Sequence, residues 1–308
     1  MECPAVRDLP ILPVNETLQQ LGQTLLPTQA VRELLLRCID EDGGRDGDVT
    51  SQSIIQPKAS GRFAVHVRGE GVIAGVEPLS RGIDVFGDLS MTICCQEGEE
   101  VQDATIAHLE GNIQSMLLAE RTILNVLGHA CGIATVTKQY VKAIADSECI
   151  VCDTRKTTPG LRMFDKYAVA CGGGTPHRVG LHDAALFKDN HLAGLATPSL
   201  TLAEAIKVAR QDQALKFVEV EVDSLQQLEE VLLLDVDIVL LDNFSFEQLP
   251  QAVEMRNNAA KQPLLEASGG ITLETVRVVA QTGVDRVAVG ALTHQAPWVD
   301  IGLDAIDE

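Results

Sequence analysis

From residue 148 onward the sequence alternates short apolar runs with longer segments of helical periodicity. The runs are short enough for buried strands and rich in Val, Ile and Leu. They are CIVC (149–152), AALFK (184–188), FVEVEV (217–222), DIVLL (237–241), PLLEA (263–267) and RVAVG (286–290). Strands that alternate with helices form a parallel sheet with helices outside it. The region therefore predicts an α/β fold, either a doubly wound sheet or a (β/α) barrel.

Four segments between the later runs have the apolar spacing of helices. They are LTLAEAIKVARQ (200–211), SLQQLEEVLLL (224–234), FEQLPQAVEMRNNAA (246–260) and ITLETVRVVAQTG (271–283). Polar residues or glycines stand where the strands should end: Asp153, Lys188, Glu221, Asp242, Ser268, Gly269, Gly270 and Gly290. In a barrel these ends meet at one mouth, where such enzymes keep their chemistry, so this ring of residues favours the barrel.

The chain before this region has a different pattern. In residues 28–40 one helical stripe is formed by Val31, Leu34, Leu35, Cys38 and Ile39, and Gly43-Gly44 should end the helix. Residues 61–76 and 89–101 read as short strands broken by glycine turns, and residues 104–128 as a long helix. We expect an N-terminal α+β sandwich domain (1–127), a barrel domain (128–293) and a C-terminal segment (294–308) that packs back on the first domain.

Composition limits the possible partners. The chain of 308 residues has a formal net charge of −20 and only 3% aromatic residues, so it has neither the basic stripe nor the stacking platform of nucleic-acid-binding proteins. An anionic membrane surface would repel it. No apolar run is long enough to span a bilayer, and the N-terminus lacks the pattern of a signal peptide. We expect a cytoplasmic protein that binds small molecules.

Cys149 and Cys152 have the spacing of half a zinc site, but no second half exists. They also fall in a predicted strand, where residues three apart face opposite sides and do not easily share one metal ion. Buried free thiols are therefore expected for all eight cysteines.

A segment from residue 153 to 191 concentrates six Lys or Arg residues in this acidic chain, interleaved with Gly, Pro, His and Thr. It is too rich in glycine and proline for one solvated helix face. Compensation of charge on a surface loop is the ordinary interpretation, and a binding site for anions is the alternative.

The motifs in and after this segment favour the anion site. They are DTRKTTPGLR (153–162), KYAV and CGGG (within 166–174), HRVGLHD (177–183), KDNH (188–191), VEVEVDS (218–224), LLDNF (240–244), EASGGI (266–271) and VDRVAVGALTH (284–294). In this order they closely resemble the quinolinate phosphoribosyltransferases, the decarboxylating nicotinate-nucleotide pyrophosphorylases of NAD synthesis. One departure is Pro176, since this family usually has Asn before the His-Arg pair, and it bears on the geometry of that loop.

The resemblance implies an incomplete barrel and an enzyme that converts quinolinate and phosphoribosyl pyrophosphate into nicotinate mononucleotide, CO₂ and pyrophosphate. Both substrates are anionic, and arginine can donate two hydrogen bonds to one carboxylate. The resemblance assigns Arg121, Arg155 and Arg178 to quinolinate and places His177 beside them. It assigns Lys156 to a substrate carboxylate and Lys188 to the phosphate-bearing substrate, both among the catalytic residues.

Two carboxylates stand at the ends of successive predicted strands. Burying the carboxylates of Glu221 and Asp242 there would be costly unless a cation or hydroxyl compensates their charge. The resemblance places both, as catalytic residues, toward the ribose hydroxyls and Mg²⁺. Glu219 shares the face of Glu221, and only the resemblance distinguishes the two. A separate group of four residues, in ASGGI and VGAL, is a candidate site for the 5′-phosphate: Ser268, Gly269, Gly270 and Gly290.

The reaction needs no nucleophilic side chain, so Cys171 and Ser268 are not expected to be covalent catalysts. The resemblance further implies a homodimer in which Arg121 of one subunit completes the site of the other. Three alternatives remain: a nicotinate-type phosphoribosyltransferase without decarboxylation, a phosphosugar lyase or aldolase with Lys188 as a Schiff base, and a non-catalytic anion-binding homologue.

Overall fold

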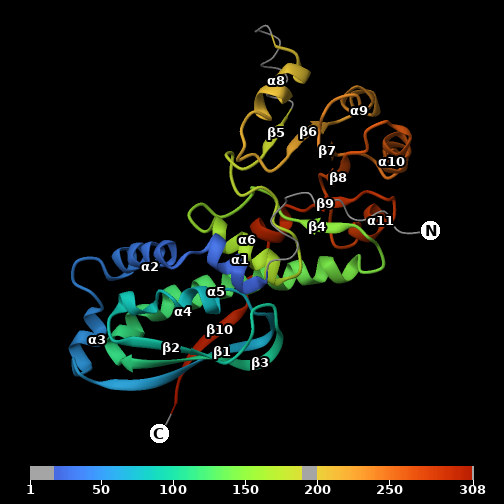
Figure 1. The fold of residues 1–308 in the computed structure, drawn as a ribbon. Helices are drawn as coiled ribbons and strands as arrows, with labels where there is room; N and C mark the ends of the chain where they lie inside the picture. The colour runs from blue at the N-terminus through green and yellow to red at the C-terminus, as the bar shows by residue number, and fades with distance from the viewer. Residues whose placement is uncertain (1–16, 189–199, 307–308) are drawn as a thin grey trace. The chain divides into compact units, whose positions relative to one another are not determined.

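The structure is a computed structural model that describes residues 17–188 and 200–306. Cys3 and the last three residues of the KDNH motif lie outside the described residues. By their contacts, the described residues form two compact units (Figure 1). The parallel-sheet unit comprises residues 139–156, 174–188 and 200–291, and the antiparallel-sheet unit comprises residues 17–138, 157–173 and 292–306. The domain boundaries predicted after residues 127 and 293 stay predictions.

The parallel-sheet unit contains one strand in each of the six predicted runs, which confirms those predictions. The strands are β4 (Ile150–Cys152), β5 (Ala185–Phe187), β6 (Val218–Val222), β7 (Ile238–Asp242), β8 (Leu264–Ser268) and β9 (Arg286–Ala288). All of their pairings are parallel, in the order β4-β9-β8-β7-β6-β5. Strands β5 to β9 are neighbours in chain order, and β4 pairs with the last of them. This cyclic order is that of a (β/α) barrel open between β4 and β5, as expected.

Each of the four predicted helical segments contains a helix. They are α8 (Leu202–Ala209), α9 (Leu225–Val231), α10 (Gln248–Asn258) and α11 (Val276–Ala280), followed by the short α12 (Ala291–His294). Along β6, β7 and β8 one face is apolar and fully buried, with Val220, Leu241 and Leu265 on it. Because side chains alternate along a strand, the other face carries the charged residues of the same strands.

A four-stranded antiparallel sheet forms the core of the other unit, in the order β10-β1-β3-β2. Its strands are β1 (Ser60–Val72), β2 (Leu89–Ile93), β3 (Glu100–Asn112) and β10 (Asp300–Ala305). Strand β10 pairs antiparallel with β1, with Val65 opposite Leu303. Residues 300–305 thus supply an edge strand to a sheet built from residues 60–112.

Helices complete this unit. They are α1 (Leu18–Leu25), α2 (Thr28–Gly43), α3 (Val49–Ile54), α4 (Val76–Ser80), the 3₁₀ helix η1 (Ile83–Phe86), α5 (Ile113–Ala143) and α6 (Arg162–Cys171). The last five residues of α5, 139–143, belong to the parallel-sheet unit. Helix α2 confirms the predicted stripe, since Val31 and Leu35 are fully buried, and it ends at Gly44. Helix α5 passes very close to the chain before β10: a Cβ on Gly132 would lie 2.2 Å from the Pro297 carbonyl oxygen, so only glycine fits there.

Three predictions for this unit were wrong. The long helix does not begin near residue 104, because residues 100–112 form β3 and α5 begins at Ile113. Residues 60–72 form one long strand rather than short strands, since β1 pairs with both β3 and β10. The seven described cysteines are free thiols, but they are not all buried: Cys94 is exposed, and Cys38 and Cys95 are partly exposed.

Candidate active site

The carboxyl ends of the parallel strands bring together several of the predicted site residues. Asp242 on β7 lies directly opposite Ser268 on β8, and Glu221 on β6 is in register with Leu240, two residues before Asp242. These three polar side chains therefore share one face and one end of the sheet. Asp153, which follows β4, is fully buried and accepts a hydrogen bond from the His177 backbone N–H at 2.6 Å.

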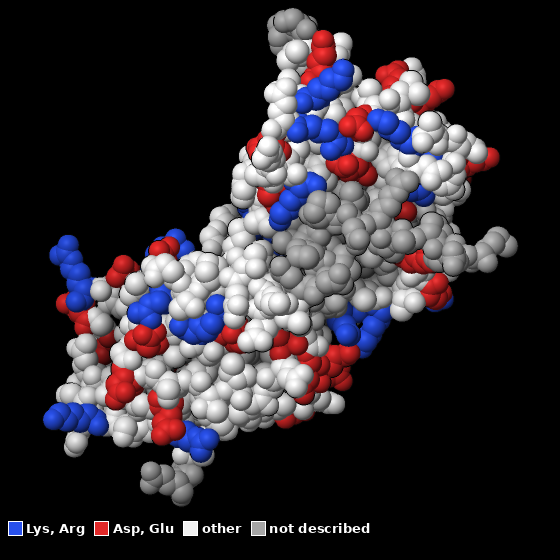
Figure 2. Space-filling view, in the orientation of Figure 1, with Lys and Arg blue, Asp and Glu red and all other residues white. Residues whose placement is uncertain are grey.

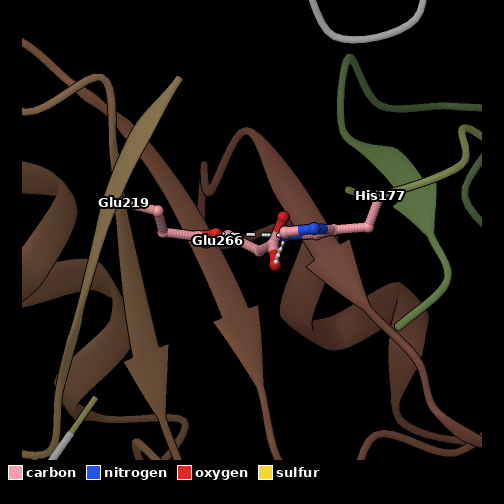
Figure 3. Close-up of side chains that lie close together, drawn as sticks. All are labelled: His177, Glu219 and Glu266. Carbon is pink, nitrogen blue, oxygen red and sulfur yellow. Dashed lines mark ion pairs between the residues drawn. The ribbon is translucent and has the colours of Figure 1, made fainter. Parts of the chain in front are cut away.

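Two carboxylates face the same ring nitrogen of His177 (Figure 3). Its Nε2 atom is 3.2 Å from Glu219 Oε2 on β6 and 3.1 Å from Glu266 Oε1 on β8. Both glutamates are completely buried. On the other side of Glu266, the Arg286 guanidinium of β9 lies 2.8 Å from Oε2 and is also completely buried. These four charged or polar side chains form a cluster in the interior of the unit, which we call the His177 cluster.

Two observations indicate which nitrogen of His177 carries a hydrogen. Burial lowers the pKa of the imidazole, but Glu266 and Glu219 outweigh burial and raise this pKa to about 10. Such a pKa implies hydrogens on both ring nitrogens at neutral pH, whereas the Arg178 backbone N–H donates to Nδ1 at 2.7 Å, which requires Nδ1 without hydrogen. We favour a bare Nδ1, since that contact has no room for a second hydrogen. Both observations leave Nε2 protonated and close to the two carboxylates.

Arg178 is a buried cation for which no described carboxylate lies within ion-pair distance. Only 8% of the residue is exposed, and its Nη1 donates to the Ala184 carbonyl oxygen at 3.3 Å. Burial, with a further contribution from the like charge of Arg155, lowers the pKa of the guanidinium. A buried charge without a counter-ion is costly. Arg178, which lies near the like charge of Arg155, would therefore be stabilised by a bound anion.

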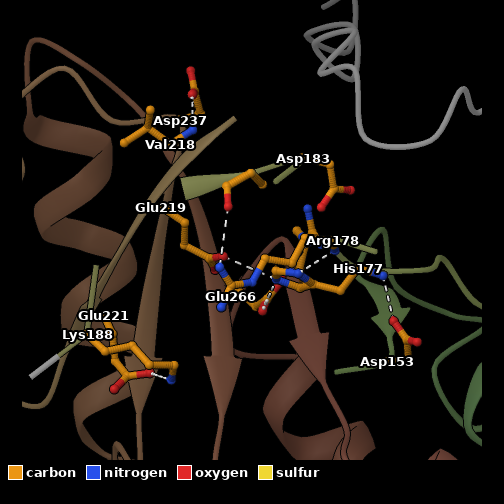
Figure 4. Close-up of polar contacts among 12 residues, drawn as sticks. Asp153, His177, Arg178, Asp183, Lys188, Val218, Glu219, Glu221, Asp237 and Glu266 are labelled. Carbon is orange, nitrogen blue, oxygen red and sulfur yellow. Dashed lines mark hydrogen bonds and ion pairs between the residues drawn. The ribbon is translucent and has the colours of Figure 1, made fainter. Parts of the chain in front are cut away.

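Lys188 follows β5 and forms an ion pair with Glu221 Oε2 (Figure 4). Glu221 is mostly buried, with 13% of its side chain exposed, whereas 40% of the Lys188 side chain is exposed. Asp242 accepts a hydrogen bond from the Asn243 side-chain amide at 2.8 Å. Lys156 is exposed in the loop after β4. The strand ends thus offer cations and hard carboxylate oxygens close to one another.

Ser268, Gly269 and Gly270 form a tight turn after β8. Gly269 and Gly270 have φ of +97° and +61°, a region that glycine adopts without strain. The Ser268 carbonyl oxygen accepts the Asn243 N–H at 2.9 Å, which fastens the turn to the end of β7. A cavity of about 310 Å³ adjoins it, lined in part by Asn243, Ser268 and both glycines.

We expect Gly269→Ala to destabilise the protein more than Gly283→Ala does. Both glycines have positive φ, +97° and +91°, which costs a non-glycine residue about 1–2 kcal/mol. A Cβ at Gly269 would also lie 2.1 Å from Asn243 Oδ1, whereas at Gly283 the nearest atom is 3.4 Å away. Urea unfolding would measure the difference between the two variants. Equal losses would mean that the Asn243 side chain moves aside without cost.

Pro176 fits the loop in which the family usually has Asn. The N–H of Thr175 donates to the Val151 carbonyl oxygen at 2.8 Å, and that of His177 donates to Asp153. In this extended stretch, successive N–H groups point to opposite sides, so an N–H at residue 176 would point away from β4. Proline therefore removes no hydrogen bond to β4, and the loop geometry keeps its contacts.

Arg121 belongs to the antiparallel-sheet unit, whereas the other predicted site residues belong to the parallel-sheet unit. It lies on α5, its side chain is 69% exposed, and its Nη2 is 3.0 Å from Oε1 of the adjacent Glu120. Gly290 follows β9 and precedes α12.

Glu266 and Arg286 were not predicted as site residues, although both stand in the motifs that resemble the family, EASGGI and VDRVAVGALTH. Their signal was a charged residue inside an otherwise apolar strand, in PLLEAS and in DRVAVG. The two residues are directly paired across β8 and β9, and such register between strands cannot be read from a single sequence.

Figure 2 shows Lys and Arg side chains interspersed with Asp and Glu on the face drawn, rather than gathered into one large patch. Among the described residues, no helix combines the length and the apolar character that a membrane span needs.

Comparison with known families gives two matches that cover most of the chain. The model of the quinolinate phosphoribosyl transferase N-terminal domain matches residues 48–131, and that of the C-terminal domain matches residues 133–304.

Individual relatives agree with these matches. A carboxylating nicotinate-nucleotide pyrophosphorylase of Mycobacterium leprae is 40% identical over 279 residues, covering 89% of this chain and 97% of the relative. A mitochondrial decarboxylating quinolinate phosphoribosyltransferase of Nicotiana tabacum is 34% identical, covering 90% and 82%. The solved nicotinate-nucleotide pyrophosphorylase of Francisella tularensis superposes with a TM-score of 0.81 at 35% identity, covering 91% of this chain and 97% of that one.

Proposed function

Because this chain belongs to the quinolinate phosphoribosyl transferase family, we propose that it transfers phosphoribosyl from phosphoribosyl pyrophosphate to quinolinate, with loss of CO₂. The products are nicotinate mononucleotide and pyrophosphate, so the reaction is a step of NAD synthesis. The chain is thus a phosphoribosyltransferase, and the roles given below to single residues are our proposals.

The observation that carries the proposal is the buried Arg178 guanidinium, which has no carboxylate partner among the described residues and lies near Arg155. A dicarboxylate that bound there would supply the missing counter-charge, and each guanidinium can hold two oxygens of one carboxylate. Lys156 would add a point charge from the exposed loop after β4. The Lys188 ammonium is already paired with Glu221 and would be shared with the phosphate-bearing substrate.

In the first step the pyridine nitrogen of quinolinate attacks C1′ of the ribose. The N–C1′ bond forms while the bond from C1′ to pyrophosphate breaks, and positive charge develops on the ribose ring. Glu221 and Asp242 lie on the same face at the ends of adjacent strands, where their charge would stabilise that developing cation. The protein contributes position and electrostatics, and no side chain forms a covalent bond.

In the second step the bond between ring carbon C2 and its carboxylate breaks. The adjacent nitrogen, now quaternary, stabilises the electron pair left on C2, and a proton replaces the CO₂. The carboxylate on C3 stays in the product. The cations around it, Arg155 and Arg178 among them, would therefore hold the ring through both steps.

Glu221 and Asp242 would hold Mg²⁺. Both offer hard carboxylate oxygens near each other, which is the donor type that this ion takes when phosphate oxygens complete its shell. Asp242 has one amide contact, from Asn243, whereas Glu221 carries the Lys188 ammonium, so the pair fits the ion with Asp242 as the more accessible partner. When bound, Mg²⁺ would neutralise charge on the departing pyrophosphate.

The turn after β8 would bind the 5′-phosphate. Gly269 and Gly270 have no side chains of their own to shield their backbone N–H groups, Ser268 adds a hydroxyl, and Gly290 follows the neighbouring strand. Sites of this kind at the last strands are common in (β/α) barrels. The adjoining cavity of about 310 Å³ shows that the turn borders open space.

We also propose a homodimer in which Arg121 of one subunit reaches the quinolinate of the other. The exposed position of Arg121 on α5 and its place in the unit without the parallel sheet are compatible with this arrangement. A cytoplasmic location stays a prediction, and the free thiols of the described cysteines are typical of a reducing compartment.

An assay with quinolinate, phosphoribosyl pyrophosphate and Mg²⁺ should release CO₂ and form nicotinate mononucleotide in equal amounts. Nicotinate should be at least about tenfold poorer in kcat/KM, because it leaves the cations of the second carboxylate without a partner. Phthalate should bind and inhibit, since it has both carboxylates but no ring nitrogen. Equal rates with quinolinate and nicotinate would support the nicotinate-type alternative, and no turnover of either would support a non-catalytic homologue.

A further inference from the structure

Both ring nitrogens of His177 are engaged inside the protein. Nε2 lies within ion-pair distance of Glu266 and Glu219, and Nδ1 accepts the backbone N–H of Arg178. Only 5% of the residue is exposed. The imidazole therefore has no nitrogen left to present to a substrate. Instead it connects two parts of a chain of contacts, which runs from Arg286 and Glu266 to the backbone of Arg178.

One end of this chain of contacts is fixed by Arg286. Its guanidinium pairs with Glu266 Oε2, while Glu266 Oε1 faces His177, so the carboxylate is held from both sides and cannot rotate without breaking a contact. Phe217 adds a steric limit, because its ring meets the imidazole edge-on at 5.5 Å between centroids. The rotation of the His177 ring is thus determined by neighbours on β6, β8 and β9.

The ligand atoms of His177, Glu219 and Glu266 lie within 4.8 Å of one another, close enough to share a metal ion. The Arg286 cation argues against such an ion, since a divalent metal would be placed next to a guanidinium that already neutralises Glu266. Ion pairs of Glu266 with His177 and Arg286, and of Glu219 with His177, bring opposite charges together in the cluster without a metal.

The other end of the chain of contacts is the loop that carries Arg178. This loop is anchored before the arginine by His177, through Asp153 and Nδ1. It is anchored after the arginine by Asp183, whose carboxylate accepts the N–H groups of Val179 and Gly180 at 2.8 and 2.9 Å. Moving the imidazole would break the contact of Nδ1 with the Arg178 N–H, whereas the contacts of Asp153 and Asp183 with the backbone of this loop would remain.

We propose that Glu266, held by Arg286, is a positioning residue that fixes the imidazole of His177 and through it the peptide N–H and guanidinium of Arg178. In this role His177 does not bind the substrate. It transmits the fixed position of Glu266 in the barrel interior to Arg178 in the anion site. This proposal rests on the proposed function only in that Arg178 is taken to bind the carboxylate of quinolinate.

A double-mutant cycle between Glu266→Gln and Arg178→Met tests the proposal. In the otherwise wild-type enzyme, Glu266→Gln should lower kcat/KM for quinolinate about tenfold and leave the KM for phosphoribosyl pyrophosphate within about twofold. In the Arg178→Met background the same change should cost less than about twofold, because the group that it positions is gone. An equal loss in both backgrounds would overturn the proposal and make Glu266 a support of the fold alone.

Asp285→Asn is the matched control. It breaks another ion pair of the same unit, in which Arg256 Nη1 lies 2.7 Å from Asp285 Oδ2, at the residue that directly precedes Arg286 and β9. It should lower the melting temperature and change kcat/KM by less than about twofold in either background. A selective tenfold loss with Asp285→Asn would show that any weakened ion pair disturbs the site.

If Glu266→Gln does not fold, His177→Gln carries the same test. Its side-chain amide can still donate to the buried carboxylates but offers no ring nitrogen to the Arg178 N–H, so the same dependence on Arg178 is expected, and equal losses in both backgrounds would again overturn the proposal. Turnover of quinolinate by the wild-type enzyme is measured first. Its absence would count against the proposed function, whereas turnover with additive losses would count against the positioning role only.

Discussion

Replacing Arg178 with methionine should lower kcat/KM for quinolinate by about 100-fold or more, while the melting temperature stays the same or rises. A forked, charge-assisted contact to a carboxylate contributes two hydrogen bonds of about 1.5–3 kcal/mol each, and about 2.7 kcal/mol corresponds to 100-fold. In the free protein no carboxylate of residues 17–188 or 200–306 pairs with the buried guanidinium, so an apolar side chain of similar length removes a desolvation cost. Steady-state kinetics and thermal unfolding of the same preparation would measure both effects.

Two further variants test whether the loss is specific to the guanidinium of Arg178. Arg178→Lys keeps the charge but loses the fork, and should lose about tenfold in kcat/KM. Arg210→Met removes an arginine of the same unit that pairs with Asp235 and Asp237 at 3.1 Å, and should leave kcat/KM unchanged. A marked loss of stability with unchanged kinetics in Arg178→Met would show that the guanidinium supports the fold and does not bind substrate.

Mixing two inactive variants should restore about a quarter of the wild-type activity, if Arg121 acts in the partner subunit. The variants are Arg121→Ala and Lys188→Ala, whose lesions lie in different units of the chain. In a mixed dimer, one site would combine an intact parallel-sheet unit from the first variant with an intact arginine from the second. Random exchange makes about half of the dimers mixed, with one working site of two in each, which gives about a quarter.

The control for this experiment mixes Arg155→Met with Lys188→Ala. Both residues lie in the parallel-sheet unit, so every site in a mixed dimer keeps one lesion and no activity should return. Exchange of subunits is verified with two differently tagged chains. If exchange is complete and the Arg121→Ala mixture stays inactive, Arg121 acts within its own subunit or has no role in the reaction.

The sequence predicted the parallel-sheet unit well because its strands are nearly continuous apolar runs, each bounded by polar residues or glycines. Local pattern and tertiary structure agree in such a unit. Residues 104–112, ATIAHLEGN, were wrongly predicted as helix because their spacing suits either structure. These residues form a strand because they pair with β1 on one side and β2 on the other. Pairing between residues distant in the sequence outweighs local conformational preference.

The candidate site was predictable where the residue type alone indicates a function, as cations do in an acidic chain. Arg155, Arg178 and Lys188 stand out because cations interleaved with glycine are unusual in a chain of net charge −20. The His177 cluster was not predictable in the same way. Its meaning depends on which side chains share the interior face and on which nitrogen of His177 meets which carboxylate, and only a three-dimensional arrangement determines that.

The pairing of β10 with β1 has a consequence for the nascent protein. A ribosome makes residues 60–72 early and residues 300–305 only after almost the whole parallel-sheet unit. Until then β1, thirteen residues long, presents one row of unsatisfied backbone groups, which is a template for pairing with another chain. Translation that stops before residue 300 should therefore yield aggregation-prone chains, even though every proposed catalytic residue has already been made.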